Sequence, residues 1–176
     1  MRGAVLEQAN QAITIRDDIE IIEPRVGEVR VNIKYCGLGH SDLGFVDGTM
    51  PMMGPMIPGH EASGIVESVG AGVTHLVPGD HVVLTPAPPC GRCYYCQRNQ
   101  QSLCVNAMSI MTNLLPDGVS GLELDGAQLL RGCGIGGLAE YVVQPATGAI
   151  KIDKDIPLEV ACVIGCALQT GGGAAL

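Results

Sequence analysis

The sequence has few aromatic residues, with no tryptophan, one phenylalanine and four tyrosines among 176 residues. A hydrophobic core must therefore be built mainly from valine, isoleucine, leucine and methionine. Apolar residues make up 47% of the chain, which is typical of a globular domain and excludes an intrinsically disordered one.

Basic residues are also scarce, and the formal net charge is −8. This balance argues against nucleic acid as a partner, because nucleic-acid recognition depends on lysine and arginine. The N-terminal segment MRGAVLEQAN has no long apolar region of the kind found in signal peptides. The longest uncharged apolar run, residues 160–176, is too short and too rich in glycine to span a bilayer. We therefore expect a cytoplasmic protein without a membrane partner.

Glycine and proline, by contrast, are abundant at 25 and 11 residues, which predicts many turns between short elements. Apolar and polar residues alternate over 29–34, the period of a strand with one buried face. Two Asp-Gly pairs in 115–130 predict a hairpin, and Pro157 predicts the first position of a helix. The methionine-rich segment 50–59 is expected to be a loop packed on the core. Further strands are expected over 64–70, 80–86 and 139–143. The fold class is therefore mainly β, a barrel or sandwich with few short helices.

The segment CGRCYYCQRNQQSLC carries the strongest motif. It contains four cysteines within fifteen residues, namely Cys90, Cys93, Cys96 and Cys104. Four closely spaced thiolates suit a structural zinc with closed tetrahedral coordination, and Arg92 and Arg98 could offset part of their charge. Two disulfides are a less favoured alternative, because no secretion signal is seen. An iron–sulfur redox site remains the other alternative.

The glycine-rich segment GCGIGG, residues 132–137, matches the dinucleotide-binding pattern G-x-G-x-x-G. That pattern requires a preceding strand and a following helix. Here the following residues AEYVV predict a strand, and the expected acidic residue could at best be Asp153 or Asp155. We interpret the segment as a glycine turn leading into a strand.

Several weaker motifs gain weight from their order along the chain. They are GHSD at 39–42, GHEASGIVESVG at 59–70, PGDHVV at 78–83, the four-cysteine segment, GLAEYVV at 137–143 and IGC…TGGGAA at 164–175. Together they resemble the zinc-dependent alcohol dehydrogenases of the medium-chain dehydrogenase family, in particular members with a long zinc lobe. The resemblance covers nearly the whole chain and implies a GroES-like β-barrel with a protruding four-cysteine zinc lobe at about 86–106.

The resemblance also implies a catalytic zinc held by a cysteine, a histidine and a second cysteine. His60 and Cys166 match the second and third ligands, and Glu61 matches an acidic residue that lies near the zinc. Asp42 matches the carboxylate that orients the ligating histidine.

The other roles implied by the resemblance concern the substrate and the nicotinamide cofactor. Ser41 matches the hydroxyl residue that binds the alcohol and begins the proton relay. His40 matches a residue that contacts the cofactor pyrophosphate, and Thr170 matches one near the nicotinamide. The implied reaction interconverts a small alcohol and an aldehyde or ketone, with NAD or NADP as hydride carrier.

The sequence departs from this family pattern at the first zinc ligand, where Gly39 stands in place of a cysteine. Cys36 does not occupy that register, since three extended residues place it about 10 Å away on the opposite face of the strand; we expect it to be a small buried side chain. Catalytic zinc sites normally have three protein ligands. We therefore expect the catalytic zinc to be weakened or absent while the lobe zinc is retained, unless Glu61 or an extra water completes the shell.

Smaller expectations complete the interpretation of the site. Leu43 and Gly44 follow Asp42 where some relatives have a relay histidine. Cys133 and Cys162 lie outside both clusters and are expected to be structural. Phe45 and the methionine-rich segment suggest an apolar substrate pocket.

The resemblance further implies that residues 1–176 form an incomplete catalytic domain and that the Rossmann cofactor domain lies outside this chain. The longer protein would be a homo-oligomer. Two functions therefore stay open: part of an alcohol dehydrogenase, or an inactive zinc-stabilised GroES-like module.

Overall fold

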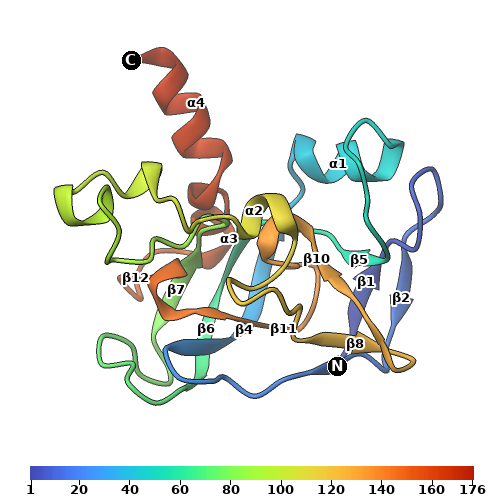
Figure 1. Ribbon diagram of the computed structural model, residues 1–176, viewed down its shortest axis with the longest axis horizontal. Coiled ribbons are helices and arrows are strands. Elements are labelled where there is room, and N and C mark those ends of the chain that lie inside the picture. Colours follow the sequence, from blue (N-terminus) through green and yellow to red (C-terminus); the bar gives the residue numbers. More distant parts are fainter.

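The computed structural model describes residues 1–176, in which strands outnumber α-helices and every helix is short (Figure 1). This confirms the predicted, mainly β fold class. The strands are β1 (Gly3–Val5), β2 (Thr14–Arg16), β3 (Glu20–Ile21), β4 (Glu28–Gly37), β5 (Met56–Ile57), β6 (Glu61–Val69), β7 (His81–Leu84), β8 (Leu122–Leu124), β9 (Ala127–Gln128), β10 (Leu130–Arg131), β11 (Tyr141–Pro145) and β12 (Ala149–Ile152). The α-helices are α1 (His40–Asp47), α2 (Ser109–Thr112), α3 (Leu158–Ala161) and α4 (Ala167–Ala175). Five short 3₁₀ helices are η1 (Cys96–Arg98), η2 (Gln101–Leu103), η3 (Gly132–Gly134), η4 (Ala146–Gly148) and η5 (Cys162–Gly165).

A five-stranded sheet in the order β11-β4-β6-β7-β12 forms the centre of the molecule, and all its neighbouring strands are antiparallel. In β4 the predicted alternation is present, since Val29 and Val31 are fully buried and the residues between and after them are more exposed. Val31 pairs with Val66 across β4 and β6. One face of this sheet thus carries the largest apolar cluster, which consists of Val29, Val31, Ala62, Val66, Leu76, Val82, Leu84, Ile135, Val142, Ala146 and Ala149.

Three smaller sheets surround this centre: β1-β2, β3-β8-β9 and the parallel pair β5-β10. The predicted hairpin is confirmed as β8 and β9, joined by Asp125 and Gly126, both with positive φ as in a type I′ turn. The expectation of a loop over residues 50–59 was only partly correct. Met56 and Ile57 are fully buried and form β5, because their backbone pairs with a segment more than seventy residues later in the sequence.

The glycine-rich segment 132–137 is a turn leading towards a strand, as predicted. It begins with η3 and continues to β11 without an α-helix. Gly134 and Gly136 both have positive φ, a conformation that glycine adopts without steric cost. The segment folds beside the buried Arg131, whose guanidinium donates hydrogen bonds to the carbonyls of Ser120 and Ile135. These glycines therefore serve the packing of a turn.

The C-terminal segment forms α3, η5 and α4 in succession, and α4 extends away from the central sheet (Figure 1). The predicted helix start was one residue early, because Pro157 is extended and caps a helix that begins at Leu158. No single helix is long and apolar enough to cross a membrane. The two helical segments 158–165 and 167–175 would be long and apolar enough only if taken together, and they are bent by 61° relative to each other.

The close approach of β4 and β6 generates the first prediction. A β-carbon on Gly64 would lie only 2.3 Å from the carbonyl oxygen of Asn32 on β4. Gly64→Ala should therefore lower the free energy of unfolding by about 2 kcal/mol or more, through overpacking, as measured by urea denaturation. Gly172→Ala on exposed α4, where a β-carbon meets nothing, is the control and should not destabilise the protein. Equal stability of Gly64→Ala and the parent protein would contradict this packing.

Candidate functional site

The four cysteines of the lobe come together around one point. Cys90, Cys93, Cys96 and Cys104 have sulfur atoms that all lie within 4.8 Å of one another. The Cys93 and Cys104 sulfurs are 3.9 Å apart, close to the roughly 3.8 Å edge of a tetrahedron with Zn–S bonds of about 2.3 Å. No disulfide links any of the eight cysteines. The donor set therefore fits a structural zinc, and the disulfide alternative is not supported.

Hydrogen bonds around the lobe favour thiolates. The Asn106 side-chain amide donates to the Cys90 sulfur at 3.2 Å, and the Cys90 backbone N–H donates to the Cys104 sulfur at 3.3 Å. The Asn106 bond, with backbone N–H donors, lowers the pKa of Cys90 to about 6. Backbone N–H donors also lower the pKa of Cys93, whereas burial raises that of Cys96 to about 11. A bound cation would favour deprotonation of all four.

Of the two arginines expected to offset the lobe's charge, Arg98 is engaged elsewhere in the lobe. Its guanidinium stacks 3.7 Å from the centre of the Tyr94 ring and donates to the Tyr94 carbonyl. Arg98 is therefore held by the Tyr94 ring and carbonyl, and the Arg92 side chain is exposed.

A second cluster of donor side chains forms where β6 begins and α4 begins. The donor atoms of His60, Glu61 and Cys166 lie within 4.8 Å of one another. His60 and Glu61 are almost fully buried, and Cys166 is partly exposed. Residues separated by more than a hundred positions thus present a nitrogen, an oxygen and a sulfur to one small volume, which fits a divalent transition metal.

The orientation of His60 is set by Asp42, which is fully buried at the third position of α1. The His60 Nδ1 lies 3.1 Å from the Asp42 Oδ2, and the same carboxylate accepts hydrogen bonds from the Gly39 and Gly59 backbone N–H groups. Since an ionised carboxylate can only accept, the His60 proton resides on Nδ1. The Nε2 atom is therefore free to bind a metal.

The pKa values of this pair follow from the same contacts. Burial raises the pKa of Asp42, but the hydrogen bonds from His60, Gly59 and Gly39 outweigh it and the net pKa is lowered. The hydrogen bond to Asp42 raises the pKa of His60 above its ordinary value, against the opposing effect of burial.

Gly39 lies directly against this second cluster. A β-carbon there would be 3.3 Å from the His60 Nε2 and 3.2 Å from a Glu61 carboxylate oxygen. It would also be 2.7 Å from the His60 Cε1, so a side chain at this position would require a small shift of the imidazole. Position 39 is therefore next to the metal donors, and no side-chain donor is present there.

Other residues singled out in the sequence lie around this cluster. His40 and Ser41 occupy the first turn of α1, with His40 exposed and Ser41 partly buried. Thr170 is exposed on α4, and its backbone N–H donates to the Cys166 carbonyl, which places it one turn beyond Cys166. Helix α1 itself was not predicted. It begins where the backbone N–H of Gly39 donates to the Asp42 carboxylate, and it ends at Gly48 in a left-handed conformation, so an aspartate three residues after one glycine and a second glycine at the end were the available sequence signals.

The remaining cysteines are placed as predicted outside both clusters. Cys36 is partly buried beside Gly59 and Gly137, and burial raises its thiol pKa to about 12. Cys133 is buried in an apolar cluster, and the Cys162 thiol is near the Glu159 carbonyl.

The apolar residues suggested for a substrate pocket mostly lie in the core. Phe45 is 2% exposed and packs with Leu6, Met56 and Leu130, so the suggestion was wrong for this residue. Met50 and Met52 pack partly against the same cluster.

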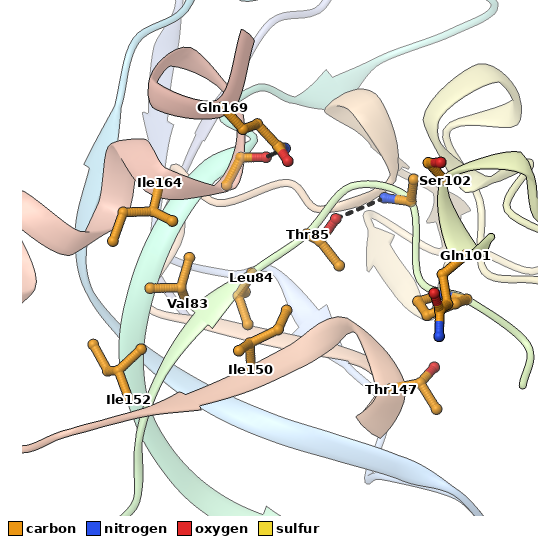
Figure 2. A pocket seen from close by; sticks show the side chains of 13 residues that line it. Val83, Leu84, Thr85, Gln101, Ser102, Thr147, Ile150, Ile152, Ile164 and Gln169 are labelled. Atoms are coloured by element: carbon orange, nitrogen blue, oxygen red, sulfur yellow. Dashed lines mark hydrogen bonds between the residues drawn. The ribbon is translucent and has the colours of Figure 1, made fainter. Parts of the chain in front are cut away.

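A cavity of about 510 Å³ lies between the lobe and the C-terminal helices, and none of the metal-donor side chains of the two clusters lines it. Figure 2 shows Ile164 and Gln169 on one side, Val83, Ile150 and Ile152 of the sheet below, and Gln101 and Ser102 of the lobe opposite. It is lined by no titratable side chain, so we do not place the chemistry there.

The Asp42–His60 pair generates a pH prediction for metal-depleted protein. Because the pKa of His60 is raised in the folded protein, the pair stabilises the fold below about pH 6.5, and this stability is lost as the pH rises through the pKa of folded His60. Because the pKa of Asp42 is lowered, the pair also stabilises the fold above about pH 3.8. Asp42→Asn should therefore lower the free energy of unfolding most between about pH 4 and 6.5, and less at higher pH. Urea denaturation at a series of pH values measures this difference. Asp47→Asn, an exposed site on the same helix, should show no change near pH 6.5. A pH-independent Asp42→Asn effect would contradict this assignment.

The sequence model described as "Alcohol dehydrogenase GroES-like domain" matches residues 25–154. Alcohol dehydrogenase B of Mycobacterium tuberculosis is 37% identical over 177 residues, which cover 99% of this chain and 47% of that protein. The chain spans about half the length of the curated relatives it matches.

Two solved structures are similar over nearly the whole chain. One is an alcohol dehydrogenase zinc-binding domain protein from Burkholderia ambifaria, with a TM-score of 0.88 at 34% identity, covering 98% of this chain and 47% of that one. The other is benzyl alcohol dehydrogenase from Acinetobacter calcoaceticus, with a TM-score of 0.87 at 30% identity, covering 99% and 47%. With the family match extending over residues 25–154, the chain belongs to the alcohol dehydrogenase GroES-like domain family.

Proposed function

We propose that these residues form the zinc- and substrate-binding part of an oxidoreductase that interconverts a small alcohol and an aldehyde or ketone with NAD or NADP. The observation that carries the proposal is the assembly of Asp42, His60, Glu61 and Cys166 from three separate segments at one place. Membership of the alcohol dehydrogenase GroES-like family and the place of Ser41 in α1, next in sequence to Asp42, support it.

In this proposal His60 and Cys166 are metal ligands, and Asp42 positions His60 by holding its proton on Nδ1. A bound zinc would polarise the alcohol oxygen and lower its pKa. Glu61 would lie near the metal, and its carboxylate could approach it.

The first turn of α1 supplies the proton path and part of the cofactor contact. The Ser41 hydroxyl would accept the proton of the alcohol and pass its own proton on, a role that suits a partly exposed side chain next in sequence to Asp42. His40 would contact the pyrophosphate of a bound nicotinamide cofactor, and Thr170 would lie near its nicotinamide. With Leu43 and Gly44 in place of a relay histidine, the proton path would end in solvent or at another group.

The lobe, residues 86–106, holds a structural zinc through Cys90, Cys93, Cys96 and Cys104 and takes no part in the reaction. We assign residues 1–176 to one catalytic domain and the cofactor site to a part of the protein outside them. The longer protein would be a cytoplasmic homo-oligomer that binds neither nucleic acid nor membrane. The net charge of −8 supports the exclusion of nucleic acid.

One observation favours a second function, a catalytically inactive module stabilised by the lobe zinc. Gly39 removes a side-chain donor next to His60, and three donors are then available only if Glu61 takes part. The experiment below separates this alternative from the enzyme.

Turnover tests the proposed function. The chain joined to the cofactor-binding half of alcohol dehydrogenase B from M. tuberculosis should oxidise small alcohols with NAD or NADP, followed by absorbance of the reduced nicotinamide. Ser41→Ala should lower kcat by about 100-fold or more, because general acid–base groups typically contribute 10²–10⁴-fold. Ser41→Thr keeps the hydroxyl and should retain most activity.

The inactive-module alternative has its own signature in the same assay. No turnover of any alcohol or aldehyde by the parent protein or by Gly39→Cys, with both proteins folded and their lobes loaded with zinc, would contradict the enzyme proposal.

Metal content tests the lobe. Cys93→Ser should lose the one tightly held zinc, seen by elemental analysis, and should become sensitive to proteolysis within 86–106 while the central sheet persists. Cys162→Ser, a buried cysteine outside both clusters, is the control and should keep the zinc. Iron in the purified protein, with its absorbance, would instead favour the iron–sulfur alternative.

A further inference from the structure

We propose that the lobe zinc enters and leaves by way of Cys90, and that Asn106 is the positioning residue that holds Cys90 at the metal. The inference rests on the proposed function only in taking the four-cysteine cluster to be a zinc site. It adds the order in which the thiolates release the ion and the residue that sets the rate.

The first observation is that the four lobe cysteines are not equally open to solvent. Cys96 and Cys104 are buried, at 7% and 8% exposure, whereas Cys90 and Cys93 are partly exposed. Of the four, Cys90 alone lines a hollow of about 250 Å³ beside the lobe. A water molecule takes up about 30 Å³ in the liquid, so a small chelating molecule can enter the hollow and approach Cys90.

The walls of this hollow suit an anionic molecule. Arg92 and Asn106 both line it, and no acidic side chain does. A guanidinium attracts carboxylate groups and can form strong hydrogen bonds with them. The class of zinc acceptor favoured at this opening is therefore a small chelator that carries carboxylates.

The second observation concerns the hydrogen bonds that hold Cys90. Its sulfur accepts from the Asn106 side-chain amide at 3.2 Å, and its backbone N–H donates to the Cys104 sulfur at 3.3 Å. Asn106 is the only residue outside the four cysteines whose side chain donates to a lobe sulfur. Because Asn106 is exposed, its side chain can rotate away from Cys90 while the backbone of the lobe stays folded.

The third observation is the turn that places this amide. The Ala107 backbone N–H donates to the Cys104 carbonyl at 3.2 Å, the hydrogen bond of a β-turn over residues 104–107. Asparagine is common in such turns. The turn thus carries both the ligand Cys104 and the donor to Cys90, which lies 16 positions before Asn106. The amide therefore ties the N-terminal end of the lobe to its C-terminal end.

The consequence is an order of ligand exchange. Cys90 leaves first: its bond to the metal breaks, a donor atom of the chelator forms a bond in its place, and no oxidation state changes. While the Asn106 hydrogen bond is present, a Cys90 sulfur that has left the metal stays within reach and can bind again. Loss of this hydrogen bond should therefore speed the release of zinc without removing a ligand.

The rate of zinc release measures the role of Asn106. Protein loaded with one equivalent of zinc is mixed with an excess of nitrilotriacetate, a small carboxylate chelator, and a coloured indicator follows the zinc. Asn106→Ala should release zinc about 10-fold faster or more, since residues that support metal ligands change metal affinity by about 10–100-fold. Asn106→Asp, which has the same shape but only accepts hydrogen bonds, should also release it faster. Gln97→Ala, an exposed amide of the same lobe, is the matched control and should release zinc at the parent rate.

Cobalt in place of zinc gives a signature that a merely structural role would not move. A hydrogen bond to a thiolate lowers the energy of the sulfur lone pairs. The near-ultraviolet sulfur-to-cobalt absorption of Asn106→Ala should therefore shift to a longer wavelength than in the parent protein. Asn106→Gln, which keeps an amide donor, should absorb closer to the parent protein than Asn106→Ala does.

Alkylation tests which ligand leaves first in the unaltered protein. N-ethylmaleimide, added while the chelator slowly removes zinc, should modify Cys90 before the other three lobe cysteines, as read by mass spectrometry of peptides. Cys93 is the internal control, because it is also partly exposed but does not line the hollow. Modification of Cys93 before Cys90 would overturn the proposed order.

The outcomes separate this inference from the proposed function. If Asn106→Ala releases zinc at the parent rate, Asn106 does not position Cys90 and the inference fails, while the lobe zinc and the proposed function stand. If the reduced parent protein binds no zinc through its four lobe cysteines, the proposed lobe site fails and the inference fails with it.

Discussion

The carboxylate of Asp42 is the interaction on which the second centre depends. It is fully buried and accepts three hydrogen bonds, from the Gly39 backbone, the Gly59 backbone and the His60 imidazole. The first bond starts α1 and the second fixes the turn that leads into β6. The third orients the imidazole. Because one ionised group holds all three, the start of the helix and the direction of His60 cannot change independently.

The two metal centres are built in opposite ways. The lobe takes all four donors from fifteen residues and positions them with local N–H···S bonds, so its assembly needs little of the rest of the fold. The second centre needs α1, the start of β6 and the start of α4 in their final positions. Local closure costs less chain entropy than assembly across the whole chain. The lobe donors can therefore assemble early in folding, whereas the second site forms only with the complete domain.

Much of the fold and of the lobe was predictable, because their signals are local. Alternation marked β4, an Asp-Gly pair marked the β8–β9 turn, and cysteine spacing marked the lobe. Features that depend on distant partners were not predictable. Met56 and Ile57 form a strand only because β10 lies beside them. The burial of Phe45 and the contacts of Asp42 likewise depend on segments that the sequence does not bring together. His60 and Cys166 were identified from the resemblance of several motifs, in order along the chain, to the zinc-dependent alcohol dehydrogenases. The spacing of the two residues alone would not have identified them.

The same geometry explains how a glycine can stand beside the second centre without disturbing the fold. Gly39 takes part in the Asp42 network only through its backbone N–H, so the cap of α1 and the tautomer of His60 do not require a side chain at this position. The site can therefore lose a donor while its supporting hydrogen bonds remain. The donor atoms of His60, Glu61 and Cys166 stay within 4.8 Å of one another without any side chain at position 39. The backbone of Gly39 thus keeps the hydrogen bonds that support the site, whereas the side chain at this position would decide only how many donors a metal meets.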